Sequence, residues 1–219
     1  QEALLANYNQ SWLDMATMPG ASGDIMAGVW ERVNGKSFVW YPKAAFDAAG
    51  YKVPTTWDEL VALQDQIVAD GDTPWCIGIE SGTATGWPVT DWLEEMMLRT
   101  TSLENYDKWV TNELKFNSPE VKAAWDKAGE IFFTPGYAYG GTTAIIATDF
   151  RTAMDPMFNE DMAKPGCWMQ KIPGWYGPDF FPDARTTGQP SKYVIGEDVG
   201  VFYLPPIDPA MGTPALGSG

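Results

Sequence analysis

Four β-rich runs alternate along the chain with segments of helical periodicity, and this alternation limits the possible folds more than any other feature. The runs cover residues 37–41, 75–79, 167–172 and 199–204. Strands that alternate with helices are typical of an α/β domain, in which helices cover a sheet that is at least partly parallel. We therefore predict an α/β fold with a mixed sheet flanked by helices.

The helical segments carry clear start signals. Thr56 and Glu59 have the spacing of a capping box, in which each side chain bonds a backbone N–H at the helix start. Ser118 followed by Pro119 is typical of a helix N-cap with proline at the first helical position. A third helix is predicted from Pro88. Its inward side chains are Trp92, Leu93, Met96 and Met97, and Trp57, Trp109 and Trp125 are expected in the core on the same periodicity.

Composition excludes several function classes. The 219 residues include 14 basic and 29 acidic side chains, and the net charge of −15 disfavours binding to nucleic acid or to an anionic membrane. The chain has no histidine, which excludes a Ser-His-Asp triad and histidine-bearing zinc sites. No apolar stretch approaches the roughly 20 residues of a membrane-spanning helix. We expect no nucleic-acid partner, no metal and no cofactor.

Both ends of the sequence are typical of an excised piece. Gln1 is not methionine, and no basic start with an apolar segment precedes it. Residues 209–219 are small, almost uncharged and rich in glycine and proline, as in a connector between domains. We therefore expect a fragment of a longer protein.

Several segments together resemble the extracellular solute-binding proteins of ABC transporters, most closely the sugar-binding group that includes maltose- and alpha-glucoside-binding proteins. The segments are 36–43 (KSFVWYPK), 46–51 (FDAAGY), 53–60 (VPTTWDEL), 71–75 (GDTPW), 86–88 (GWP) and 202–206 (FYLPP). Proteins of this family have two α/β lobes joined by crossover strands. The resemblance implies that residues 1–28 end a first-lobe segment, 29–200 form the second lobe, and 201–219 hold the return crossover and a linker.

The resemblance also implies a function. Such a protein is a monomer in the periplasm or outside the cell, binds a sugar between its lobes, and delivers it to the membrane permease subunits of the transporter. It is not an enzyme. Because half of the cleft belongs to the other lobe, we expect residues 1–219 alone to bind sugar poorly.

Trp87 is the main candidate for sugar binding. It lies in a polar loop, 81–88, that leads from a predicted strand into a helix, and loops after strand ends are where α/β proteins bind ligands. The family has ligand-contacting aromatic residues in this loop, because an indole packs on the apolar face of a sugar ring. Thr83 and Thr85 add hydroxyl groups. The alternative is an indole folded back onto its own helix.

Three further places in the sequence hold weaker candidates. Asp91 could bind a hydroxyl group or interact with the helix dipole from the first turn. Asn34, with Glu31 and Arg32 beside it, lies in the predicted crossover, although Asn34-Gly35 is also a common turn dipeptide. The resemblance implies an aromatic residue near the strand at 167–172, for which we select Trp175 and keep Trp168 as the alternative.

Two other function classes compete with sugar transport. In a glycoside hydrolase, Asp91, Glu94 and Glu95 would be a carboxylate cluster, but Asp91 and Glu95 share one helix face and the sequence shows no opposing carboxylate. A calcium-dependent lectin would need an Asp- and Asn-rich loop, which the sequence lacks. We prefer the binding protein.

The two cysteines, Cys76 and Cys167, are predicted to form a disulfide. Both lie in runs that we expect to be neighbouring strands, and an exported protein folds in an oxidising compartment. The alternative is a pair of buried thiols, which behave as small hydrophobic side chains.

Overall fold

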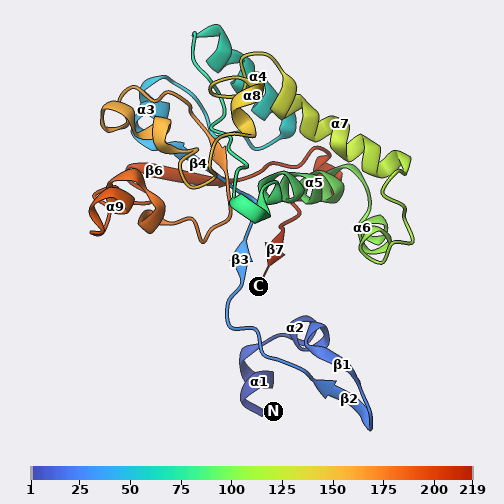
Figure 1. Cartoon of the computed structure of the whole chain (residues 1–219). Coiled ribbons are helices and arrows are strands. Elements are labelled where there is room, and N and C mark those ends of the chain that lie inside the picture. Colours follow the sequence, from blue (N-terminus) through green and yellow to red (C-terminus); the bar gives the residue numbers. More distant parts are fainter. Residues whose placement is uncertain (1, 219) are drawn as a thin grey trace. The chain divides into compact units, whose positions relative to one another are not determined.

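The computed structural model describes residues 2–218, which form two compact units (Figure 1). The smaller unit runs to Asn34 and resumes at Gly217, and the larger one is Gly35–Leu216. In the smaller unit, an antiparallel hairpin follows two short helices, and Trp12 packs edge-on against Trp30. Its elements are α1 (Glu2–Asn7), α2 (Gln10–Met15), β1 (Thr17–Gly20) and β2 (Gly23–Met26). The chain passes between the units at β3 (Asn34–Gly35) and before β7 (Gly217–Ser218).

A three-stranded sheet forms the centre of the larger unit. Its middle strand is β4 (Phe38–Pro42), which pairs antiparallel with β5 (Gln170–Lys171) and with β6 (Val199–Tyr203). Beyond β5 the sheet continues in parallel orientation, because residues 73–76 exchange backbone hydrogen bonds with residues 168–169 at 2.8–3.1 Å. The mixed sheet predicted from the sequence is therefore confirmed.

Helices surround this sheet, and α5 packs along α7 (Figure 1). The α-helices of the larger unit are α3 (Lys43–Ala48), α4 (Trp57–Ala69), α5 (Trp87–Thr100), α6 (Leu103–Val110), α7 (Pro119–Phe133), α8 (Thr142–Ile145) and α9 (Pro182–Thr187). Short 3-10 segments are η1 (Gly82–Ala84), η2 (Asp155–Met162), η3 (Pro178–Phe180) and η4 (Pro209–Met211).

The helix start signals predict two helices correctly and a third to within one residue. Thr56 and Glu59 make the reciprocal capping bonds at the start of α4, and the Ser118 hydroxyl accepts from the Val121 N–H at the start of α7. The third helix, α5, begins at Trp87 rather than Pro88, directly after Gly86.

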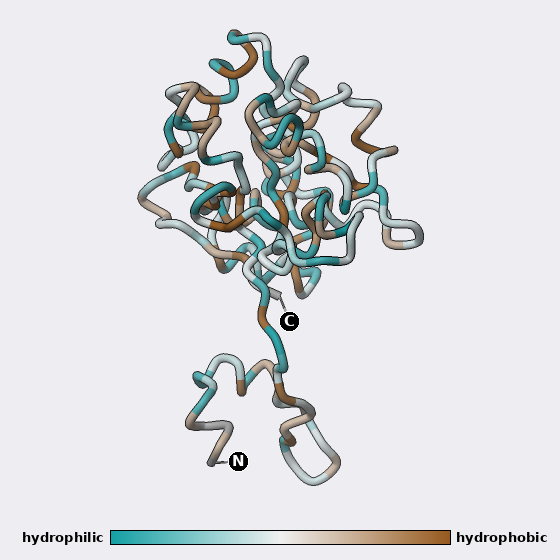
Figure 2. Tube along the Cα trace, turned by 90° about the vertical axis from the view of Figure 1, so that its left-hand side faces the viewer, coloured by the Kyte–Doolittle hydropathy of each residue, from teal (hydrophilic) through white to brown (hydrophobic). Residues whose placement is uncertain are grey.

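The core lies between the sheet and the amphipathic helices. All four inward side chains predicted for α5 are at most 3% exposed. Trp57 is equally buried, whereas Trp109 and Trp125 are half-buried against the same core. Hydrophobic and hydrophilic residues alternate in short runs along the trace of this unit (Figure 2), as amphipathic elements require.

Two local expectations are wrong. Residues 75–79 do not form a continuous strand, because the backbone partner changes from Tyr137 and Tyr139, at Trp75, to Ile145, the last residue of the inserted helix α8, at Ile79. Asn34-Gly35 is not a turn, since both residues belong to the short strand β3.

The predicted disulfide is present. Cys76 and Cys167 are bonded, and both are at most 1% exposed. The bond joins two segments that lie side by side, because the Cys76 N–H donates to the carbonyl of Met169. The disulfide therefore links the segment at residues 75–79, which leads into the loop at 81–88, to the segment at 167–169, which leads into β5.

Candidate functional site

Three large aromatic side chains from separate parts of the sequence meet at one place in the larger unit. The Trp87 ring centroid lies 5.1 Å from that of Phe150 and 5.9 Å from that of Trp175, and the Phe150 and Trp175 centroids are 6.0 Å apart. All three side chains are half-buried and pack against a group of buried side chains that includes Cys76, Met157 and Ile172. We call Trp87, Phe150 and Trp175 the aromatic cluster.

The loop before α5 holds Trp87 rigidly. The Gly86 N–H donates to the carbonyl of Ile79 at 3.0 Å, and the Gly82 N–H donates to the Glu80 carboxylate at 2.6 Å. Gly86 has a φ of 103°, a left-handed conformation that residues with a side chain rarely adopt, and it allows α5 to start at the next residue. The indole is therefore carried by a fixed loop-helix junction.

Phe150 and Trp175 are held by the segments beside this loop. The Phe150 N–H donates to the carbonyl of Glu80 at 3.1 Å, so its segment pairs directly with the start of the loop. Next to Trp175, the Tyr176 hydroxyl donates to the carbonyl of Arg151 at 2.7 Å. Burial raises the pKa of the Tyr176 hydroxyl, so it remains a neutral donor. These bonds tie all three segments together.

Of the two tryptophans proposed near β5, the structure brings only Trp175 to Trp87. Trp168 is 5% exposed and packs between Phe46 and Tyr51, with centroid distances of 6.1 and 4.9 Å. The different surroundings follow from position, because Trp168 precedes β5 within the sheet and Trp175 lies in the loop after it.

The two loop threonines differ in their hydrogen bonding. Both are exposed. The Thr85 hydroxyl closes the loop, donating to the Gly82 carbonyl at 2.8 Å and accepting from the Ser81 N–H at 3.0 Å. Thr83 lies in η1 beside them. The roles of both residues in ligand binding stay predictions.

Asp91 is buried and ion-paired. Because α5 begins at Trp87, Asp91 lies beyond the first helical turn, so the alternative role for Asp91, an interaction with the helix dipole, is wrong. Instead its Oδ1 atom accepts from the Lys36 ammonium at 2.6 Å, and its side chain is only 4% exposed. The Oδ2 atom is buried without a hydrogen-bond partner among the described residues. Its sugar contact stays a prediction.

The other two acidic residues of α5 do not form a catalytic pair with Asp91. Glu95 is fully buried and binds Arg99, and it lies 3.6 Å from the ammonium of Lys171. Burial raises the pKa of the half-buried Glu94, and the nearby charges of Lys36 and Asp91 act in opposite directions. Of the cluster considered for the hydrolase alternative, Asp91 and Glu95 are therefore held in ion pairs within the fold.

Asn34, Glu31 and Arg32 belong to the smaller unit. Asn34 is half-buried, and Glu31 and Arg32 are exposed. Their part in ligand binding stays a prediction.

The sequence analysis missed Phe150 and its neighbours Asp149 and Arg151. These two side chains form an ion pair beside the aromatic cluster, and the guanidinium carbon lies 5.7 Å from the Phe150 centroid. Their segment follows α8 and has no regular strand pattern, so no periodicity in the sequence marks it. The cluster with this polar rim can pack on an apolar ring face and donate hydrogen bonds at its edge.

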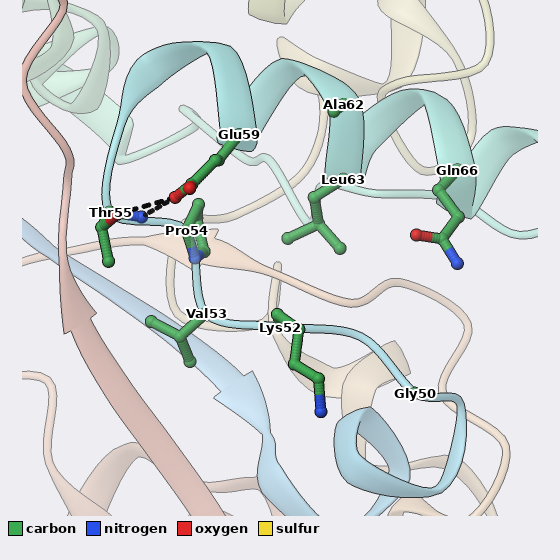
Figure 3. Close-up of a pocket in the computed structure, with 9 residues that line it drawn as sticks. All are labelled: Gly50, Lys52, Val53, Pro54, Thr55, Glu59, Ala62, Leu63 and Gln66. Carbon is green, nitrogen blue, oxygen red and sulfur yellow. Dashed lines mark hydrogen bonds between the residues drawn. The ribbon is translucent and has the colours of Figure 1, made fainter.

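A further hollow lies elsewhere, between α4 and the preceding loop (Figure 3). Its volume is about 350 Å³, and its walls include Lys52, Leu63 and Gln66. The Glu59 carboxylate at its end already accepts from the Thr55 N–H and hydroxyl, each at 2.7 Å. It has no aromatic wall, so we assign the site to the aromatic cluster instead.

Comparison with known proteins places the chain in a family. The model of the bacterial extracellular solute-binding proteins matches residues 3–161. The chain belongs to this family. This solute-binding protein is 40% identical to the alpha-glucosides-binding periplasmic protein AglE of Rhizobium meliloti and 38% identical to the osmoprotective compounds-binding protein GgtB of Synechocystis. The matches cover 99% and 100% of this chain but 46% and 48% of the two relatives, so the chain spans about half of their length.

Solved structures agree on the fold. A chitin oligosaccharide binding protein superposes with a TM-score of 0.72 at 19% identity, over 99% of this chain and 48% of that one. The bacterial solute receptor AcbH gives a TM-score of 0.70, also at 19% identity, over 99% and 49% of the two chains. These matches confirm a solute-binding-protein lobe with sheets flanked by helices.

Residues 2–218 of this solute-binding protein lack a membrane-spanning helix and a cluster of metal ligands. None of the helices there is both long and apolar enough to cross a bilayer. The same residues contain no group of three histidine, cysteine or acidic side chains arranged to hold a metal ion.

Proposed function

We propose that this chain forms one lobe of a receptor that binds a sugar between two lobes and delivers it to the permease of an ABC transporter. The observation that carries the proposal is the meeting of Trp87, Phe150 and Trp175 in a half-exposed cluster. Stacking on a sugar ring explains why such large apolar surfaces stay partly outside the core.

The proposed ligand is an alpha-glucoside or a related oligosaccharide. This specificity rests on the 40% identity to a relative described as alpha-glucosides-binding. The second relative is described as binding osmoprotective compounds, which makes polyols the natural comparison ligands. In the proposal, Thr83, Thr85, Asp91 and Asn34 contribute polar contacts, and Trp175 extends the surface offered by Trp87.

The proposal includes an exported monomer that performs no chemistry on its ligand. A buried disulfide is typical of proteins that fold in oxidising compartments. Two of the three acidic residues of α5 considered for hydrolysis, Asp91 and Glu95, are engaged in ion pairs with Lys36, Arg99 and Lys171.

A thermal-shift screen tests the proposal. The full-length protein, meaning this chain together with the second lobe that the proposal requires, is melted with α-linked and β-linked glucose disaccharides and with polyols. A ligand at 100 times its dissociation constant stabilises by about 2.7 kcal/mol, so an α-linked sugar should clearly raise the melting temperature. Absence of any shift across neutral sugars would contradict the proposal, and a shift with polyols alone would replace the ligand class.

A further inference from the structure

Asp149 and Arg151, two residues apart in the sequence, form an ion pair beside the aromatic cluster through several hydrogen bonds. The Asp149 Oδ1 atom accepts from the backbone N–H of Arg151 at 2.8 Å and from its Nε at 2.9 Å. The Oδ2 atom accepts from Nη2 of the same guanidinium. Such a fork fixes the plane of the guanidinium as well as its position.

Arg151 keeps unused donors in this arrangement. A guanidinium has five N–H groups, and the Asp149 bonds use those of Nε and one of Nη2. The remaining N–H groups lie on a side chain that is 56% exposed, whereas the Asp149 side chain is 23% exposed and both of its oxygens are occupied. Arg151 is therefore the member of the pair that can reach a ligand, and Asp149 positions it.

The backbone beneath this pair is anchored to the candidate site. The Arg151 carbonyl accepts from Tyr176, next to Trp175, and the Phe150 N–H donates to Glu80 at the start of the Trp87 loop. The guanidinium carbon is 5.7 Å from the Phe150 centroid. A ring stacked on the aromatic cluster thus has fixed donors at its edge.

The electrostatic surroundings cancel the charge of the guanidinium. Hydrogen bonding to Arg151 holds the pKa of Asp149 below its usual range, so the carboxylate stays ionised at neutral pH. The charge of Glu80 also raises the pKa of Arg151 and adds a second negative charge near the guanidinium, while the charge of Arg185 helps to lower the pKa of Asp149.

We infer that Arg151, positioned by Asp149, is a ligand-binding residue that donates to the hydroxyl groups of a sugar stacked on the aromatic cluster and that its paired charge favours neutral over anionic sugars. This assignment rests on the proposed function and adds to it the polar half of the site. An unpaired arginine at the same place would instead attract carboxylates or phosphates.

Calorimetry on the full-length protein tests the inference with Arg151→Ala, Arg151→Lys and Asp149→Asn. The probes are maltose and maltose 6-phosphate, which differ by one anionic group. Arg151→Ala should weaken maltose binding by about tenfold to a hundredfold, the range expected for lost bonds to a charged donor. Arg151→Lys should restore only part of this, because an ammonium lacks the planar fork.

Asp149→Asn supplies a selectivity measurement that a purely structural role would not change. Removing the paired charge should raise the affinity for maltose 6-phosphate relative to maltose by about fivefold or more, with a stronger dependence on salt. Lys122→Ala is the matched control, because Lys122 forms an exposed ion pair with Asp126 on α7 and should leave both affinities unchanged.

The outcomes separate this inference from the proposed function. Maltose binding that is lost in Trp87→Ala but unchanged in Arg151→Ala would overturn the inference and leave the proposed function intact. An unchanged ratio of the two affinities in Asp149→Asn would overturn the charge-cancelling role. If no neutral sugar binds the wild-type protein at all, the proposed function itself fails.

Discussion

The indole rings of Trp87 and Trp175 lie with their centroids 5.9 Å apart and their planes inclined by 43°, although the residues belong to different loops of the larger unit. Trp87 opens α5, and Trp175 follows β5. Phe150 closes the group from a third segment. Each ring packs against the other two and limits their movement.

Truncation of Trp87 should affect binding more than folding. A stacked indole covers on the order of 100 Å² of apolar surface, worth roughly 2–3 kcal/mol. Trp87→Ala in the full-length protein should therefore weaken sugar binding by tens-fold, as measured by calorimetry, and change the melting temperature of the ligand-free form only slightly. Trp92→Ala is the control, because Trp92 is 3% exposed and its loss should lower stability by about 3–5 kcal/mol. A large loss of stability with affinity retained in Trp87→Ala would assign Trp87 to the core instead.

The disulfide should contribute substantially to stability. Cys76 and Cys167 are separated by 91 residues, for which the loop-entropy relation gives up to about 4–5 kcal/mol. Reductant should lower the melting temperature of the wild-type protein but leave that of the Cys76→Ala, Cys167→Ala double variant unchanged. Two free thiols per chain, titrated in denaturant without reductant, would contradict the bond.

The buried ion pair on α5 should be costly to break from one side. The Arg99 guanidinium binds Glu95 and also donates to the carbonyls of Leu204 and Pro205 at 2.8 and 3.0 Å. Arg99→Met leaves these buried acceptors without their donor and should destabilise by about 3–5 kcal/mol in urea unfolding. Lys122→Met removes one member of an exposed pair on α7 and should cost below about 0.5 kcal/mol. Equal losses of unfolding free energy in Arg99→Met and Lys122→Met would contradict the prediction that the buried pair matters more than the exposed one.

Glu94 should make stability depend on pH in a defined direction. Burial raises the pKa of Glu94 in the folded protein above its pKa in the unfolded chain. Its contribution to stability is therefore present at a pH below the pKa of the unfolded chain and is lost as the pH rises through the pKa of the folded protein. Glu94→Gln should therefore raise the melting temperature at pH 7 and have little effect near pH 3.

Glu104 provides the opposite case as a control. Its hydrogen bond from Lys108 lowers its pKa, so its contribution is present above the unfolded pKa and is lost as the pH falls. Glu104→Gln should lower the melting temperature slightly at pH 7. A Glu94→Gln variant that is less stable than the wild type at pH 7 would contradict the prediction for Glu94, because it would show that the ionised carboxylate stabilises the fold.

Local sequence patterns were sufficient for the elements with strong signals. The capping box at Thr56 and the Ser118-Pro119 pair predicted helix starts, because the atoms that satisfy a helix end come from residues within one turn. The apolar period of α5 likewise predicted its buried face. The surroundings of side chains that contact residues far away in the sequence depended on the tertiary structure instead. Asp91 pairs with Lys36, and Trp168 is buried between Phe46 and Tyr51.

The candidate site divides in the same way. Trp87 was proposed from its place in a polar, glycine-containing loop before a helix and from the family resemblance at Gly86-Trp87-Pro88, and Trp175 from the aromatic residue that the resemblance implies near the β-rich run at 167–172. Phe150, Asp149 and Arg151 carry no such local mark, since their segment reaches the cluster through the backbone of Glu80 and the hydroxyl of Tyr176. Sequence therefore indicated two segments of the candidate site, whereas tertiary structure decided which aromatic and charged side chains meet there, because long-range backbone pairing has no periodic signature in the chain.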